Sequence, residues 1–170
     1  MRDLLIAGNW KMNNTISQTE ELIQTLISGF NLLSPFVKIL VCPPFINILK
    51  AREIASGSPI HIGAQNCYSE QQGAFTGEVS AKMLKAVGCE YVIVGHSERR
   101  TIFAESNEFI NKKIKMILET GMSPILCIGE SLEQRKSDNT ITVLRSQLDA
   151  CLVEIEADDV KHIVIAYEPI

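Results

Sequence analysis

The sequence predicts an α/β protein built on a parallel β-sheet, and two patterns carry that prediction. Short, almost continuously apolar runs recur along the chain, as expected for strands buried on both faces. Stretches with helical spacing of apolar residues separate these runs, and the unit lengths suit right-handed β-α-β crossovers. The predicted strands are residues 4–7, 37–42, 60–64, 91–94, 125–128 and 163–167.

Local signals mark where the intervening helices begin and end. Residues 17–20 (S-x-x-E) and 131–134 (S-x-x-Q) each match a capping box, which opens a helix. Gly88 and Gly121 predict helix ends. About five helices are expected, and their predicted inward stripes are Leu22, Leu26, Phe30 and Leu33; Met83, Leu84 and Val87; Ile110, Ile114, Ile117 and Leu118; and Ile141, Leu144, Leu148, Cys151, Leu152 and Ile155.

Two architectures use such units: an open doubly wound sheet and a closed eight-stranded barrel. The apolar pattern alone does not choose between them. The chain ends within three residues of the sixth predicted strand, whereas an eight-unit barrel takes about 250 residues. Residues 1–170 are therefore expected to form a single domain resembling six eighths of such a barrel, although an open sheet could also end on a strand.

Composition excludes several classes of protein. The 170 residues are 46% apolar and carry a net charge of −4, which argues against disorder and against nucleic-acid binding. The basic group Lys112, Lys113 and Lys115 predicts a solvated helix face. No apolar run reaches the length of a membrane span, and the first ten residues do not match a signal peptide. Five widely spaced cysteines without C-x-x-C predict buried thiols in a reducing compartment.

Polar and ionisable residues follow every predicted strand but the second, which ends in two prolines. Lys11 follows the first strand, His96 the fourth and Glu168 the sixth. In a barrel these strand ends converge on one mouth. Each residue also has a purely structural interpretation: a surface lysine, a capping histidine and an acid stabilised by a helix dipole. Together, a carboxylate base, a hydrogen-bond donor and a fixed cation suit proton abstraction next to a carbonyl, which needs no cofactor.

Other chemistries fail on spacing. The chain has no G-x-G-x-x-G, no G-x-x-x-x-G-K-[ST] and no G-x-S-x-G. The segment 96–98 matches the H-x-E of zinc deaminases, but no P-C-x-x-C follows it. Three scattered histidines and no cluster of acids predict that there is no metal site.

Six collinear motifs resemble the triosephosphate isomerase family. They are GNWKMN at 8–13, GAQN at 63–66, GAFTGE at 73–78, VIVGHSERR at 92–100, CIGE at 127–130 and AYEP at 166–169. The resemblance runs through the whole chain and implies the closed (β/α)8 TIM barrel, truncated here to about six parallel strands.

The resemblance also implies roles for individual residues. Glu168 would be the base that moves a proton between C1 and C2 of a triose phosphate. His96 would polarise the carbonyl as neutral imidazole, a pairing taken from the family itself. Lys11 would hold the phosphate-bearing anion and the enediolate, and Asn9 would position the substrate.

Supporting residues are implied in the same way. Ser97 would hold the base when the site is open, and Glu98 would pair with Lys11 or with an arginine. Cys127 would pack beside the site. Arg99 and Arg100 are expected to form ion pairs with carboxylates such as Glu98.

A 14-residue loop from Gln65 to Glu78 is long for a βα connection, and such loops are usually functional. In the family this loop inserts into a second subunit, with Thr76 reaching the partner's site. The resemblance therefore implies a homodimer, in which Phe75 is removed from water.

The family continues into a mobile lid and two further βα units that this sequence lacks. The implied activity is interconversion of glyceraldehyde 3-phosphate and dihydroxyacetone phosphate, without cofactor, in the cytoplasm. It would serve glycolysis, gluconeogenesis and the pentose shunt. The alternatives are an inactive truncated fragment, one half of a split enzyme, or an open-sheet sugar-phosphate-binding protein. Open edges on the first and sixth strands would favour weak stability or assembly.

Overall fold

A computed structural model describes residues 4–30 and 36–169, which contain six parallel strands in one curved sheet. Each strand pairs with the one that follows it in the chain, so the spatial order is β1-β2-β3-β4-β5-β6. All six predicted strands are confirmed, with ends moved by at most two residues. Their bounds are β1 Leu4–Asn9, β2 Val37–Cys42, β3 Ile60–Ala64, β4 Tyr91–Val94, β5 Ser123–Ile128 and β6 Val164–Tyr167.

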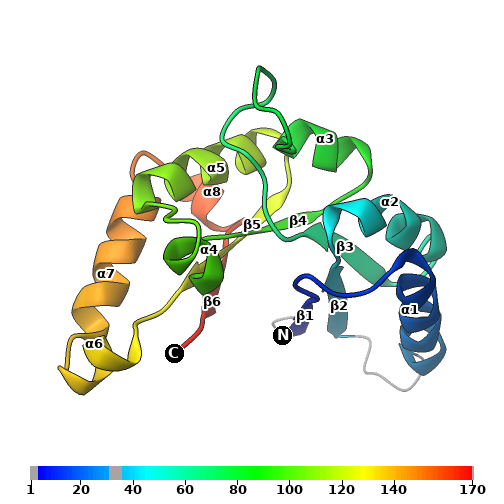
Figure 1. Cartoon of the computed structure of the whole chain (residues 1–170), viewed down its shortest axis with the longest axis horizontal. Coiled ribbons are helices and arrows are strands. Elements are labelled where there is room, and N and C mark those ends of the chain that lie inside the picture. The colour runs from blue at the N-terminus through cyan, green and yellow to red at the C-terminus, as the bar shows by residue number, and fades with distance from the viewer. Residues whose placement is uncertain (1–3, 31–35, 170) are drawn as a thin grey trace.

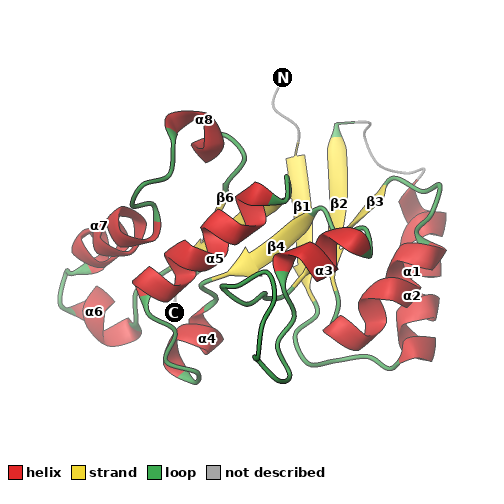
Figure 2. Cartoon of the chain, turned by 90° about the horizontal axis from the view of Figure 1, so that it is seen from above, coloured by secondary structure: helices red, strands yellow, loops and turns green. Residues whose placement is uncertain are grey.

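Helices line the convex side of the sheet, with α4 and α6 at one end of the strands and α8 at the other (Figures 1 and 2). The chain returns along the outside after each strand, which is the geometry of right-handed β-α-β units. The helices of the described residues are α1 Ile16–Phe30, α2 Phe45–Ile54, α3 Ala81–Ala86, α4 Ser97–Thr101, α5 Asn107–Glu119, α6 Leu132–Lys136, α7 Thr140–Cys151 and α8 Ala157–Val160.

The sheet buries apolar side chains on both faces, and alternation along the strands separates them into two groups. The concave face carries the smaller cluster of Leu40, Cys42, Ile93, Ile125 and Cys127. The convex face packs against the helices and forms the larger cluster, which includes Val41, Ile62, Val92, Leu126 and Ile128. The concave side chains therefore lead directly to the carboxyl ends of the strands.

Burial on both faces, expected for all six strands, is wrong for β1 and β6. Among the described residues each of these strands has one neighbouring strand. Leu4 and Ile6 are 63% and 57% exposed, and Ile165 is 46% exposed. The difference has a simple cause: these side chains face outward where the described residues supply little helical cover.

Helix starts partly differ from the sequence expectation. The box predicted at residues 131–134 is confirmed, because Ser131 and Gln134 each accept from the other's backbone N–H. The box predicted at residues 17–20 is wrong. Instead, Gln18 Oε1 accepts from the Thr15 backbone N–H at 2.9 Å and Thr15 Oγ1 accepts from that of Gln18 at 3.4 Å. The reciprocal pair lies two residues earlier, which starts α1 at Ile16.

The apolar stripe predicted after residue 140 extends beyond its helix. Helix α7 ends at Cys151, Ile155 lies past it, and Ile141 is 69% exposed. Leu33 of the first stripe lies outside the described residues. The described part of the chain has more helices than expected, because α4, α6 and α8 span only four or five residues and carry no periodic signal. None of the described helices is long and apolar enough to cross a bilayer.

Candidate active site

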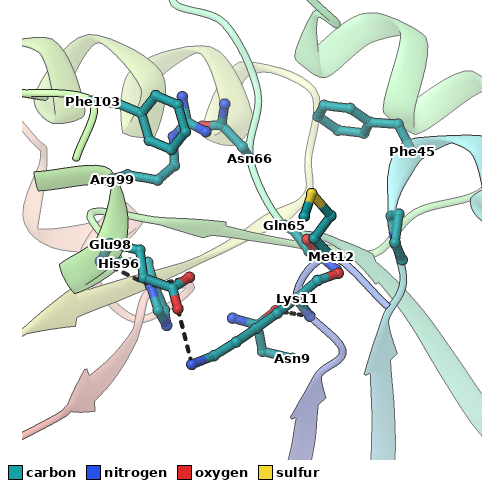
Figure 3. Close-up of a pocket in the computed structure, with 11 residues that line it drawn as sticks. Asn9, Lys11, Met12, Phe45, Gln65, Asn66, His96, Glu98, Arg99 and Phe103 are labelled. Carbon is teal, nitrogen blue, oxygen red and sulfur yellow. Dashed lines mark hydrogen bonds and ion pairs between the residues drawn. The ribbon is translucent and has the colours of Figure 1, made fainter. Parts of the chain in front are cut away.

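The carboxyl ends of β1, β4 and β6 bring three of the predicted residues to the same mouth. Asn9 ends β1 on the concave face, His96 follows β4, and Glu168 follows β6. Lys11, two residues beyond β1, reaches across toward α4 (Figure 3). The structure therefore places side by side the side chains that the sequence predicted to meet at one mouth.

Lys11 occupies a left-handed backbone conformation, with φ of 52°. Asn9 Oδ1 accepts from its backbone N–H at 3.0 Å, and Gln65 Nε2 donates to its carbonyl at 2.8 Å. These bonds hold a conformation that costs a lysine energy. Its Nζ lies 3.0 Å from Glu98 Oε1, and that hydrogen bond and ion pair raise the pKa of Lys11 (Figure 3).

His96 caps the short helix α4. Its Nδ1 accepts from the Glu98 backbone N–H at 3.3 Å. In this arrangement Nδ1 serves as the acceptor, which leaves Nε2 as the ring nitrogen that can donate. Nε2 faces the carboxylate of Glu168, with 3.6 Å between Nε2 and Oε1.

Glu168 is held at both its backbone and its carboxylate. Its backbone N–H donates to the carbonyl of Ile128 at 2.9 Å, which extends the pairing of β5 and β6 by one residue. Its Oε2 accepts from Ser97 Oγ at 3.0 Å. The carboxylate side chain is 42% exposed, so it remains accessible from the mouth.

A cavity of about 270 Å³ joins these groups on the concave side. Its floor is apolar, and its rim carries Asn9, Lys11, His96 and Glu168. Cys127 lies in the floor, where burial raises the pKa of its thiol to about 11. The thiol is therefore protonated at neutral pH and packs without being a nucleophile. Within this lining Lys11 supplies a positive charge and Glu168 a carboxylate.

Of the two arginines after Glu98, Arg99 pairs with a carboxylate as expected, whereas Arg100 has other partners. Arg99 Nε pairs with Glu105 Oε1 at 2.6 Å. Arg100 donates to the carbonyl of Gly95 at 2.7 Å and to that of Cys127 at 3.2 Å. It also donates to Asn107 Oδ1 at 2.6 Å, so within the described residues its hydrogen bonds go to no carboxylate. The carbonyls that end β4 and β5 need donors, and Arg100 supplies them.

Lys113 is buried, contrary to the expected solvated helix face. Its side chain is 1% exposed and its Nζ contacts Glu105 Oε1 at 2.6 Å and Asn66 Oδ1 at 2.8 Å. Burial lowers the pKa of Lys113, and the pairing with Glu105 opposes that shift. Lys112 and Lys115 lie close to it in the sequence and suggested that all three lysines face solvent. Nothing in the composition showed that the helix turns the Lys113 side chain inward.

A second buried carboxylate, Glu130, was not singled out for a role by the sequence. It follows β5, is fully buried, and accepts from Tyr167 Oη at 3.0 Å on both oxygens. Arg135 and Thr140 donate to the same carboxylate. Burial opposes ionisation, but the hydrogen bonds from its backbone, Tyr167 and Arg135 give a net lowering of the Glu130 pKa. Glu168 directly follows Tyr167 in the chain. The hydrogen bonds of Tyr167 to Glu130 therefore give Glu168 a second connection to the end of β5.

The loop from Gln65 to Glu78 makes contacts within itself and with α5. The Tyr68 ring lies 4.5 Å from that of Phe75, and Gln71 Nε2 donates to the Met116 carbonyl of α5 at 3.1 Å. The Glu78 backbone N–H donates to the carbonyl of Phe75 at 3.0 Å. Thr76 is exposed, and Phe75 is 39% exposed.

A second cavity of about 270 Å³ opens on the other side of Lys11, toward α2 and α4. Its apolar lining includes Met12, Phe45 and Phe103, which are 95%, 39% and 62% exposed, and its polar lining includes Gln65 and Arg99 (Figure 3). Apolar side chains are thus concentrated beside the mouth.

Six parallel strands in chain order, helices on the convex side and ionisable groups at the strand carboxyl ends define an α/β protein of the TIM-barrel class. The family model for triosephosphate isomerase matches residues 4–170, and the chain belongs to that family. The curated triosephosphate isomerase of Aquifex aeolicus is 51% identical over 166 residues, 98% of this chain and 66% of the relative.

Two further comparisons agree. The triosephosphate isomerase of Chloroflexus aurantiacus is 46% identical over all of this chain and 68% of its own length. The crystal structure of triosephosphate isomerase from Bartonella henselae superposes with a TM-score of 0.90 at 37% identity, covering 98% of this chain and 68% of that one. The chain thus spans about two thirds of the length of the relatives it matches.

Proposed function

We propose that this chain carries the catalytic face of an isomerase that interconverts glyceraldehyde 3-phosphate and dihydroxyacetone phosphate. The observation that carries the proposal is the meeting of three groups at one mouth: the carboxylate of Glu168, Nε2 of His96 3.6 Å from it, and the ammonium of Lys11. Family membership supports the substrate class.

In this proposal Glu168 removes a proton from C1 of dihydroxyacetone phosphate. The C1–H electron pair forms a C1–C2 double bond, and the carbonyl π pair moves to the oxygen on C2. His96 Nε2–H donates to the oxygen that gains charge, and the positive charge of Lys11 stabilises the enediolate and the phosphate. Glu168 returns the proton to C2 while a proton passes from the oxygen on C1 to that on C2, which completes the aldose.

The remaining residues support these three. Asn9 positions the substrate and fixes Lys11, while Glu98 orients Lys11 through their ion pair. Ser97 holds the Glu168 carboxylate in the arrangement described, before substrate enters. The reaction uses proton transfer and electrostatic stabilisation alone, and the expected absence of a metal or cofactor stays a prediction.

The direct test is isomerisation of glyceraldehyde 3-phosphate by the purified 170-residue chain, with Glu168→Gln as the control. The amide can still accept from Ser97, so the fold is kept while the base is lost. We expect the variant to lose about 10²–10⁴-fold in rate. A folded wild-type chain without turnover would refute the activity for this chain.

A second candidate is that the chain is inactive alone, as a truncated fragment or one half of a split enzyme. The exposure of Leu4, Ile6 and Ile165 on the two end strands favours it. The two candidates differ in a simple measurement: restoration of isomerase activity on adding the C-terminal third of the Aquifex relative would support the split form, and activity of the chain alone would exclude it.

We further propose a homodimer formed through the loop of residues 65–78. Exposed Phe75 and Thr76 lie on an ordered loop, and the apolar cavity around Met12 and Phe45 offers a complementary surface on a second copy. Phe75→Glu is expected to shift the sedimentation coefficient to that of a monomer. An unchanged coefficient would remove the loop from the interface. The cytoplasmic location, the single domain and the roles in sugar metabolism stay expectations of the resemblance.

A further inference from the structure

The backbone of Glu168 touches the turn that follows β5. The Glu168 N–H donates to Ile128, and a Cβ built on Gly129 would overlap the carbonyl oxygen of Glu168. Gly129 is therefore a position of close backbone approach, where no larger residue fits without displacing Glu168. Any movement of Gly129 is transmitted to the residue that carries the carboxylate.

Gly129 is itself held by one side chain from a distant helix. Gln147 of α7 accepts from the Gly129 N–H at 2.9 Å and donates to the Gly129 carbonyl at 3.0 Å. Both backbone groups of one residue are thus satisfied by a single amide. Helix α7 packs against α5 and β5, so the amide is presented from a fixed element.

The space beside Gly129 explains why such a clamp matters. A cavity of about 210 Å³ lies between α4, α6 and α7, and its lining includes Gly129, Gln147, Ser97 and Glu168. The cavity leaves room beside the Gly129 backbone on that side. The hydrogen bonds to Gln147 hold Gly129 itself, while those from Tyr167 and Arg135 to the buried Glu130 hold the next residue of the turn.

We propose that Gln147 is a positioning residue for the base: it fixes the Gly129 backbone, which in turn fixes the backbone of Glu168. The catalytic part of the proposal rests on the proposed isomerase function, and the structural part does not. Because displacements of about 1 Å can cost roughly 10²-fold in rate, loss of the clamp should lower kcat more than it changes KM. The groups proposed to bind substrate, Asn9 and Lys11, lie on β1 and the loop after it and keep their contacts.

Three variants separate the clamp from simple packing. Gln147→Met keeps the approximate shape and removes both hydrogen bonds. Gln147→Glu, when ionised, accepts from the Gly129 N–H but repels its carbonyl. When protonated, it can donate to that carbonyl again and restore the pair. Gln24→Met, on the exposed side of α1, is the matched control for the same chemical change.

The first measurement is hydrogen exchange of the Glu168 and Gly129 amides, which requires no activity. We expect exchange of both amides to rise at least about tenfold in Gln147→Met and to stay unchanged in Gln24→Met. Unchanged exchange of the Glu168 amide in Gln147→Met would overturn the proposal. Faster exchange in a wild-type-like fold that has no isomerase activity would support the positioning and refute the proposed function.

The second measurement is kcat and KM relative to wild type at pH 5 and pH 8. We expect Gln147→Met to lose roughly 10–100-fold in kcat at both values, with KM changed less than about twofold. Gln147→Glu keeps the shape of the side chain, so a role in packing alone would lose little. We expect it to match the loss of Gln147→Met at pH 8, where its carboxylate is ionised and repels the Gly129 carbonyl. Wild-type kcat in Gln147→Met, in an active chain, would overturn the proposal.

Discussion

The ion pair of Lys11 with Glu98 and that of Lys113 with Glu105 join the same chemical groups in opposite surroundings. The first is 3.0 Å long with side chains 50% and 46% exposed. The second is 2.6 Å long with side chains 1% and 4% exposed. Water screens the Lys11–Glu98 pair, so Lys11 can leave Glu98 and contact a bound anion at little cost. Lys113 is buried and has no such second partner in the described part of the chain, so its pair with Glu105 holds the surrounding elements in place.

The pKa shifts of the two lysines reflect this difference. The Glu98 carboxylate raises the pKa of Lys11, because little burial opposes the pairing. Burial lowers the pKa of Lys113 despite its contact with Glu105. A buried pair gains little net stability, but breaking it leaves an uncompensated charge. We therefore expect loss of the exposed Lys11–Glu98 pair to lower the catalytic rate. We expect loss of the buried Lys113–Glu105 pair to lower the stability of the fold.

The largest expected effect comes from Lys113→Met. Removal of the ammonium leaves Glu105 buried, with Arg99 as its remaining cation among the described residues. We expect a loss of about 3–5 kcal/mol in the free energy of unfolding. Urea denaturation measures this value. The matched control is Lys115→Met, which breaks an exposed pair with Glu154 and should cost less than about 1 kcal/mol. Equal losses in the two variants would contradict the comparison.

The next effect is on activity and comes from Lys11→Met. We expect a loss of about 10²–10³-fold in kcat/KM, because a fixed positive charge at the enediolate is removed. The free energy of unfolding should change by less than about 1 kcal/mol, since the Lys11–Glu98 pair is exposed. Steady-state assays and urea denaturation of the same sample provide both values. A stable, fully active variant would remove Lys11 from the site.

The smallest effect extends the comparison to two carboxylates with lowered pKa values, buried Glu130 and exposed Glu154. A carboxyl whose folded-state pKa is lowered contributes stability above its unfolded-state pKa. That stability is lost as the pH falls below about 4.5 and through the lowered value. Glu130→Gln should flatten the acid side of the stability curve more than Glu154→Gln. Thermal unfolding between pH 3 and pH 6 decides this, and identical curves for the two variants would contradict it.

Most of the architecture was predictable because burial on both faces of a parallel strand leaves a direct apolar pattern. The positions of Asn9, Lys11, His96 and Glu168 were also predictable, because polar residues at strand ends meet at one edge. Short helices such as α4 were not, since five residues hold little more than one helical turn and cannot show a repeat. Exposure of β1 and β6 on one face was not read from their apolar pattern either, because it depends on what covers them.

Contacts between distant side chains were the part that sequence could not supply. Lys113 looked like its exposed neighbours, and its partner Glu105 gave no sign of burial. Gln147 is a half-buried polar residue of α7 that matches no motif, although its amide holds Gly129. A glycine next to a predicted strand end was visible, but the close approach of Glu168 is a property of register, which requires the paired strands.

The order of the strands has a consequence for how the chain is made. Because β1 to β6 pair in sequence order, each βα unit leaving the ribosome meets an edge that has already been synthesised. Every strand after β1 has a pairing partner that was made just before it, so the contacts formed at each step are short in sequence and close quickly. The newest strand always has one unpaired edge. The segment most exposed to misassembly therefore moves along the chain during synthesis, while the edge of β1 stays open throughout these six units.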